Sequence, residues 1–522
     1  MRSAPFRASL LALVLPGCLA PHPDEARPEL QALMRGEVRD GWAEDAAQGN
    51  YDRTAFWLSF EDPVLNDLVL EALQYNHDLV ASAERMRASA ARAMISRSAR
   101  RPQVNARLDG TRQQQVFVGL PVGGDGTIKN TFNQFNAAVD LSWELDLWGK
   151  LAAGVEGFDA ELQATYADLQ AARLSIAAQV TIAWFALREA TEQVALAEAT
   201  VETFESSLQV VQDRYDAGLS GALDLRLSQA NVAGSEADLV GAIQNRDFAA
   251  RQIEILLGRF PSAELEAAGE FVALPPEVPA GLPVEILSRR PDIVAIERRV
   301  ASAEAFARED RLDRWPTLAL TASGGRTSQL FEDLLNGDFT VWSLAGQIAA
   351  PLIDGGRRRA QIKESLAQLR EARAAFAAAA LRAFFEVENA LDAEQRLQES
   401  IEFLERAAVL SREATELAQD QYREGLVSIE LVLESQRRQL IAEASFLTAR
   451  RNLFQNRVDL HVALGGSFDA APALAADELV RLEEADPYQP DALLQPMAPG
   501  DGVESPEEDS EENSEQPAEE PE

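Results

Sequence analysis

The sequence predicts an α+β membrane protein built from two copies of one unit, each combining a long helical hairpin with two β-strands. Three observations support this fold class. The chain is internally duplicated, two stretches of 60 residues or more lack both glycine and proline, and several segments alternate strictly between apolar and polar residues. The 522 residues are enough for several ordinary domains or for one very elongated one.

The duplication is visible at two offsets. At an offset of 207 residues, Tyr215–Gly258 aligns with Tyr422–Gly465, and at an offset of 214, Asp78 aligns with Asp292. The offset changes because the first copy has a longer loop at residues 119–130. A loop is the usual place for an insertion in a repeat. The expected boundaries are repeat 1 at 61–258, a linker at 259–283 and repeat 2 at 284–466.

Two very long helices are predicted from the stretches Phe158–Ala217 and Arg357–Glu424, which contain no glycine or proline. Apolar residues recur there at intervals of three, four and seven, which is typical of a coiled-coil seam. At 1.5 Å per residue, about 60 helical residues would reach roughly 90 Å. The seam residues are Leu162, Leu169, Ile176, Val180, Trp184, Leu187, Val194, Val201, Phe204, Leu208, Val211 and Tyr215 in copy one, and Ile362, Leu366, Leu369, Phe376, Phe384, Val387 and Leu391 in copy two.

Each long helix is expected to end at a glycine and to be followed by a return helix. Gly218 and Gly425 occupy equivalent places after the two stretches, as expected for helix-ending residues with left-handed backbone. The predicted helices are about 156–217 and 222–257 in repeat 1, and about 357–424 and 429–464 in repeat 2. Each copy is therefore a long helical hairpin.

Strands are predicted where apolar residues occupy alternate positions. Between Ala137 and Leu147 every odd residue is apolar, whereas Asp140, Glu144 and Asp146 lie among the even ones. This period favours a strand with one face in lipid and one in water over a soluble sandwich. The expected strands are about 103–118, 132–148, 317–329 and 339–352.

Four strands cannot close a barrel, and open strand edges are not tolerated in lipid. Membrane barrels begin at about eight strands. We therefore expect two or more copies of the chain to complete one barrel, and the strand count alone does not say how many.

The N-terminus predicts secretion and a lipid anchor. Residues 1–17 have the positive start and short apolar run of a signal peptide. Leu15-Pro16-Gly17-Cys18 resembles the bacterial lipobox, and Cys18 is the single cysteine of the chain. We expect lipidation at Cys18 and a lipidated N-terminal extension at 18–60, sorted to the outer membrane. The alternative is an unmodified thiol that leaves with an ordinary signal peptide.

Composition excludes several functions. The net charge of −37 argues against duplex nucleic acid as a partner.

A C-terminal segment at 467–522 is expected to carry a disordered tail, since Asp501–Glu522 contains eleven acidic residues and no Lys or Arg. The three histidines, His22, His77 and His461, are far apart, so no metal, catalytic or cofactor site is expected.

Several motifs resemble those of the TolC-like outer membrane factors. They are Phe60–Leu65, Trp143–Lys150, Arg289–Ile293, Arg214–Gly218 and its twin Gln421–Gly425. The resemblance covers roughly 57–466. Together with the lipobox, it favours the branch of outer membrane lipoproteins that serve resistance-nodulation-division (RND) efflux pumps, often called NodT.

The resemblance implies a homotrimer in which four strands per protomer make a twelve-stranded transmembrane β-barrel and the long helices form a hollow periplasmic cylinder. It also implies a passive exit duct for small molecules, such as drugs and toxic compounds, in a tripartite pump. The partners would be a periplasmic adaptor and an inner-membrane RND transporter, with no enzymatic activity and no cofactor. The alternatives are a duct for type I protein secretion and a soluble periplasmic coiled-coil scaffold.

The resemblance also places a periplasmic gate near the helix turns. The positions that match the constriction are Glu430 and Glu434, with Asp224 and Arg226 as weaker candidates in copy one. In three chains, the two glutamates would form stacked carboxylate rings that favour cations. The alternative is an ordinary solvated helix face.

Overall fold

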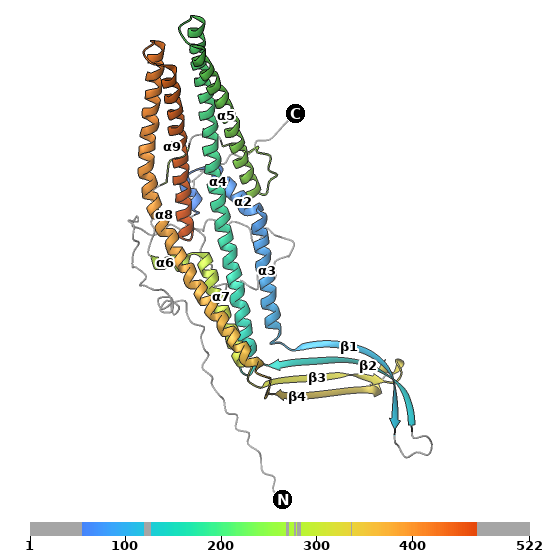
Figure 1. The fold of residues 1–522 in the computed structure, drawn as a ribbon. Coiled ribbons are helices and arrows are strands. Elements are labelled where there is room, and N and C mark those ends of the chain that lie inside the picture. The colour runs from blue at the N-terminus through green and yellow to red at the C-terminus, as the bar shows by residue number, and fades with distance from the viewer. Residues whose placement is uncertain are drawn as a thin grey trace, which may run out of the picture.

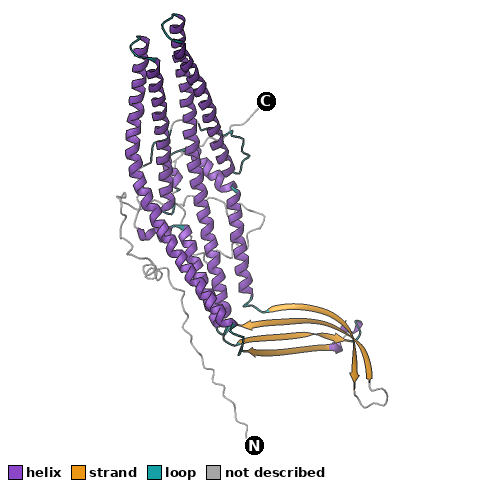
Figure 2. Cartoon of the chain, in the orientation of Figure 1, coloured by secondary structure: helices purple, strands orange, loops and turns teal. Residues whose placement is uncertain are grey.

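A computed structural model of the chain describes residues 55–118, 127–267, 271–275, 278, 283–335 and 337–466. The expected signal peptide, Cys18, most of the N-terminal extension and the C-terminal segment 467–522 lie outside the described residues. The described part is elongated, with helical hairpins at one end and a sheet at the other (Figure 1). Figure 2 shows that helix dominates and that the strands are confined to one end.

The two copies contribute the same series of elements. Repeat 1 contains η2 (Phe56–Phe60), α2 (Pro63–Tyr75), α3 (His77–Ser98), β1 (Gln103–Val118), β2 (Thr127–Leu145), α4 (Lys150–Asp216) and α5 (Ala222–Leu256). Repeat 2 contains α6 (Pro283–Arg289), α7 (Pro291–Leu312), β3 (Thr317–Ser328), η3 (Glu332–Leu335), η4 (Gly337–Phe339), β4 (Thr340–Ala349), α8 (Arg357–Arg423) and α9 (Ile429–Ala463).

Next to the sheet, α3, α4, α7 and α8 lie side by side in that order, because each packs on the next. Farther from the sheet, the same α4 and α8 pair with their return helices α5 and α9, and α4 also packs on α9. The long helices therefore form one continuous wall.

Among the helices of the described ranges, none combines the length and the apolar character needed to cross a bilayer.

The main core lies midway along the helices, where η2 and α2 pack on α4. Asp62 organises this core although it is almost fully buried. Its carboxylate accepts hydrogen bonds from the backbone N–H groups of Val64 and Leu65, which caps α2. It also accepts one from Trp184 Nε1 at 2.8 Å and pairs with Arg188 at 3.1 Å. One carboxylate thus starts α2 and fastens it to α4.

Each repeat closes on itself through an equivalent contact. In repeat 1, the side-chain amide of Asn76 donates to the carbonyl of Leu256 at 2.9 Å, which joins the start of α3 to the end of α5. In repeat 2, the guanidinium of Arg290 donates to the carbonyl of Ala463 at 3.4 Å, which joins the start of α7 to the end of α9. The donors differ by 214 residues and the acceptors by 207, so the contact preserves both offsets of the duplication.

The glycines that follow α5 and α9 permit this closure. Gly258 and Gly465 have φ of +73° and +98°, a region that disfavours residues with a Cβ. A Cβ on Gly258 would lie 2.8 Å from the Tyr75 carbonyl oxygen, and one on Gly465 would lie 3.0 Å from that of Arg289. Both return helices therefore end against the backbone that precedes the facing helix.

The expected start of the first long helix, at about 156, is wrong by nearly two turns. Helix α4 begins at Lys150 and contains Gly154 and Gly157, although a glycine inside a helix costs about 1 kcal/mol relative to alanine. A Cβ on Gly157 would lie 2.7 Å from the Phe306 ring, so this glycine allows α7 to approach α4 closely. Because Gly157 has no side chain, the Phe306 ring can pack against it, and the helix continues through this position.

Strand limits also differ from those expected. Strand β2 begins at Thr127 and ends at Leu145, and β4 ends at Ala349, so Leu147 and Leu352 lie beyond the paired residues. The alternation continues past the last hydrogen-bonded pair, because it reflects the environment of the side chains and not the ladder itself. Helix α6 begins at Pro283, the last residue of the expected linker.

Replacing Gly157 with alanine should destabilise the protein by about 1–3 kcal/mol, the usual cost of overpacking. The physical cause is the contact with Phe306, whose ring is also held edge-on against Phe158. The measurement is thermal unfolding in detergent, followed by circular dichroism at 222 nm.

Gly234→Ala is the matched control, because within one chain a Cβ on this α5 glycine would meet no atom within 4 Å. Alanine should stabilise the helix there by about 0.5–1 kcal/mol. Equal melting temperatures for the two variants would contradict the packing role of Gly157.

Candidate functional site

The two repeats share one four-stranded antiparallel sheet with the order β1-β2-β3-β4. Strand β2 of repeat 1 pairs with β3 of repeat 2 over eleven residues, from Phe135↔Ser328 to Leu145↔Leu318. Strands β1 and β4 form the two edges, and within the described residues neither has a further partner. Each edge therefore presents a row of backbone groups available to another strand.

Next to the helices, one face of this sheet is apolar across all four strands, up to the row that contains Arg326. The register places Val104, Leu141, Ala322 and Leu344 in a single row, because residues directly opposite in an antiparallel ladder lie on the same face. On the edge strand β4 the side chains of this face are largely exposed: Trp342 by 80%, Leu344 by 74% and Ile348 by 73%. A continuous apolar face of this kind requires lipid or a partner to cover it.

The opposite face is polar and internally hydrogen-bonded. Ser323 Oγ donates to Asp140 at 2.7 Å across β2 and β3. Arg107 lies 3.2 Å from Asp109 and 3.8 Å from Asp140, which connects β1 to β2. The predicted division into an apolar face and a carboxylate-bearing face is confirmed by the register.

The junction between sheet and helices is held by aromatic and ionic contacts. Trp148 stacks on Trp315 with 5.2 Å between ring centroids, and its Nε1 donates to the Pro316 carbonyl at 2.7 Å. Asp313, at the end of α7, bonds both Lys150 of α4 at 2.7 Å and Arg358 of α8 at 2.8 Å. Partial burial opposes ionisation of Asp313, but these two cations hold its pKa below the ordinary value. One ionised carboxylate thus fastens three helices where the strands leave them.

At the far end, both helix turns have the same geometry. Gly218 and Gly425 have φ of +74° and +76°. The N–H of Leu219 donates to the Arg214 carbonyl at 2.8 Å, and that of Leu426 donates to the Gln421 carbonyl at 2.8 Å. This is the hydrogen bond that closes a helix end around a left-handed glycine.

The two glutamates predicted at the gate lie in the first turns of α9, immediately after this turn. Glu434 is bonded to Arg437 at 2.6 Å and to Arg438 at 2.8 Å on its own helix. Hydrogen bonds from Arg438 and Arg437 lower the pKa of Glu434, so it is ionised at neutral pH. Glu430 lies one turn closer to the tip and is exposed.

The two weaker candidates have local roles in the structure. Asp224 accepts hydrogen bonds from Ser220 Oγ at 2.8 Å and from the Gly221 N–H at 3.2 Å, which caps α5. Arg226 donates to Gln229 at 2.9 Å, one turn along the same helix. Within the described residues, these contacts do not bring Asp224 and Arg226 together with Glu430 or Glu434.

The sequence motif Arg214–Gly218 includes Arg214, but sequence reasoning missed its contact with the other hairpin. Its guanidinium donates to the carbonyl oxygens of Tyr422 at 3.1 Å and Arg423 at 3.4 Å. It also lies over the Tyr422 ring at 4.9 Å, so one side chain ties the end of α4 to the end of α8. The sequence signal for a special role of Arg214 is a difference between the two copies, because the equivalent residue is Gln421.

Comparison with known proteins agrees with this architecture. The family model described as outer membrane efflux protein matches residues 68–259 and 282–466. The outer membrane protein OprJ of Pseudomonas aeruginosa is 30% identical over 481 residues, covering 91% of this chain and 98% of its own. Nodulation protein T of Rhizobium leguminosarum bv. viciae is 28% identical, covering 91% and 96%.

The solved structure of the outer-membrane channel OprN superposes with a TM-score of 0.74 at 29% identity, covering 83% of this chain and 98% of that one. The resemblance drawn from the sequence motifs is thereby confirmed. The chain belongs to the outer membrane efflux protein family, as its sheet, its duplicated hairpins and these matches show.

Proposed function

We propose that this outer-membrane efflux protein is the passive exit duct of a tripartite RND-type pump and works as a homotrimer. Three four-stranded sheets would close a twelve-stranded barrel, with the apolar face toward lipid and the polar face toward water. The observation that carries the proposal is the sheet itself, which has an exposed apolar face and two edges without partners among the described strands.

The helical wall supports assembly of several protomers. Helix α5 exposes Val240 by 67% and Phe248 by 59%, and α8 exposes Phe385 by 66% and Phe403 by 61%. Within the protomer, α5 and α8 do not pack substantially on each other. Packing of α5 from one copy on α8 from the next would bury these side chains and close the wall into a cylinder.

In the proposed pump, an inner-membrane RND transporter and a periplasmic adaptor deliver small molecules to the helical end, and the duct releases them outside. The tips of the two hairpins would meet the adaptor. Cys18, when lipidated, would add an anchor in the inner leaflet of the outer membrane. The duct performs no chemistry of its own, so the identity of the cargo is set by the transporter.

Leu344→Arg should prevent insertion into the outer membrane, whereas Ser343→Arg should leave it intact. Leu344 lies on the apolar face and Ser343 on the polar face of the same edge strand. An arginine facing lipid near the bilayer midplane costs about 2–4 kcal/mol per chain. The measurement is the amount of heat-modifiable oligomer in the purified outer-membrane fraction.

Equal assembly of the two variants would contradict the assignment of the lipid face. A soluble, monomeric wild-type chain in the periplasmic fraction would contradict the duct as a whole.

The proposed gate is tested by the double variant Glu430→Gln/Glu434→Gln. Removing the carboxylates should reduce the preference of the channel for cations and change its conductance. The measurement is single-channel recording in planar bilayers with asymmetric KCl. Unchanged conductance together with unchanged selectivity would refute a role for the two residues.

A matched control is Glu198→Gln/Glu202→Gln, an exposed pair with the same spacing on α4, away from the tip. It removes the same number of charges, so it should alter neither property if the effect depends on position at the gate.

Lipidation is tested by Cys18→Ser. Mass spectrometry of the mature N-terminal peptide should find diacylglycerol and an amide-linked acyl chain on the wild-type protein and neither on the variant. An unmodified wild-type N-terminus, or cleavage at another position, would refute the anchor without bearing on the barrel.

A further inference from the structure

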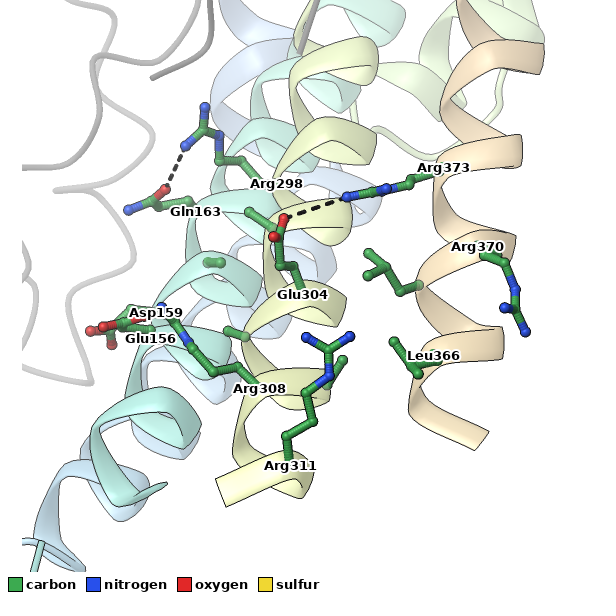
Figure 3. Close-up of a pocket in the computed structure, with 15 residues that line it drawn as sticks. Glu156, Asp159, Gln163, Arg298, Glu304, Arg308, Arg311, Leu366, Arg370 and Arg373 are labelled. Atoms are coloured by element: carbon green, nitrogen blue, oxygen red, sulfur yellow. Dashed lines mark hydrogen bonds and ion pairs between the residues drawn. The ribbon is translucent and has the colours of Figure 1, made fainter. Parts of the chain in front are cut away.

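A cleft of about 600 Å³ lies between α4, α7 and α8 on the helical wall (Figure 3). Its lining includes five arginines but three carboxylates, an excess of positive charge in a chain whose net charge is −37. The arginines are Arg298, Arg308, Arg311, Arg370 and Arg373, and the carboxylates are Glu156, Asp159 and Glu304. The cleft is therefore a cationic site on an acidic protein.

The carboxylates of the cleft are already engaged. Glu156 pairs with Arg308, Asp159 pairs at 3.0 Å with Arg97 of α3, and Glu304 lies 3.9 Å from Arg373. This leaves positive charge without a counter-ion inside the cleft.

Two arginines of the cleft form no ion pair with any residue that the structure describes. Arg311 points into the space between α7 and α8, whereas Arg370 extends from the side of α8 turned away from α7 (Figure 3). In addition, the Nε–H of Arg308 is buried and has no acceptor among the described residues. The site therefore offers both charge and a hydrogen-bond donor to an anionic occupant.

The described chain ends on the same face of the wall as this cleft. Gly466, the last described residue, lies against the Leu174 side chain of α4. Ala160, which lines the cleft, precedes Leu174 by 14 residues, close to four helical turns, so both lie on one face of α4 about 21 Å apart. Gly465 also contacts the backbone of Arg289, just before α7 begins. The chain beyond Gly466 thus continues from the face that carries the cleft.

The residues that follow have the opposite charge. The segment 467–522 contains 18 aspartates and glutamates and one basic residue, Arg481. It carries nearly half of the net charge of the whole chain. Its 56 residues could span about 180 Å when extended, so a distance of about 21 Å is well within reach.

We propose that this acidic C-terminal segment binds in the arginine cleft of its own chain and lies across α7 and α8 as a strap. Its carboxylates would complete the ion pairs that Arg311 and Arg370 lack. Single exposed ion pairs contribute little, so binding depends on several carboxylates and weakens with salt.

The test is a photo-cross-linking experiment on the full-length protein in outer-membrane vesicles. Benzoylphenylalanine at Leu366, within the cleft, should cross-link to peptides of 467–522, identified by mass spectrometry, and the product should have the mass of one chain on a denaturing gel. The same probe at Leu417, an exposed α8 residue outside the cleft, should not. Raising NaCl from about 0.05 M to 0.5 M should reduce the yield at Leu366.

Charge reversal distinguishes binding from mere proximity. Arg311→Glu/Arg370→Glu should lower the cross-link yield about tenfold, since two ion pairs become repulsive. Arg382→Glu, an exposed α8 arginine outside the cleft, should leave it unchanged. Cross-links to residues 18–54 or to another protein, no cross-link, or a yield insensitive to charge reversal would overturn the proposal. None of these results would affect the proposed duct.

Discussion

The pairing of β2 with β3 is the constraint on which the rest of the molecule depends. It joins the two repeats into one sheet and aligns their alternation of apolar and polar residues, so the apolar side chains of every strand lie on the same face. The resulting face, with Trp342 and Leu344 mostly exposed, is incompatible with water, and the edges β1 and β4 leave backbone groups without partners among the described strands. A single chain cannot satisfy both demands, which is why the fold implies lipid on one side and other copies at its edges.

The helical part is built to hold that sheet at a fixed distance from the tips. Asp313 joins three helices at the junction, Asp62 fastens α2 to α4 at mid-length, and Arg214 ties the tips. Asn76 closes repeat 1 and Arg290 closes repeat 2 at equivalent positions, one through a side-chain amide and the other through a guanidinium. These contacts brace the long helices at the sheet, at mid-length and at the tips.

Much of the architecture was predictable because it depends on local pattern. The stretch after Phe158 indicated a very long helix, the alternation after Ala137 indicated a two-faced strand, and Gly218 marked the turn. The site was less predictable: Glu430 and Glu434 do lie at the tip, but Asp224 is a helix cap. A carboxylate near a turn can cap a helix or face a lumen, and sequence spacing does not distinguish these roles.

The sequence by itself determined the duplication, the presence of two very long helices and the two faces of each strand, since these follow from the periodicity of neighbouring residues. Only the tertiary structure decided that Gly157 packs against Phe306, that Arg214 reaches Tyr422 and that the arginines of α7 and α8 surround one cleft. Each of these depends on contact between residues more than 50 positions apart in the chain. Such contacts depend on how the helices pack, which no local pattern records.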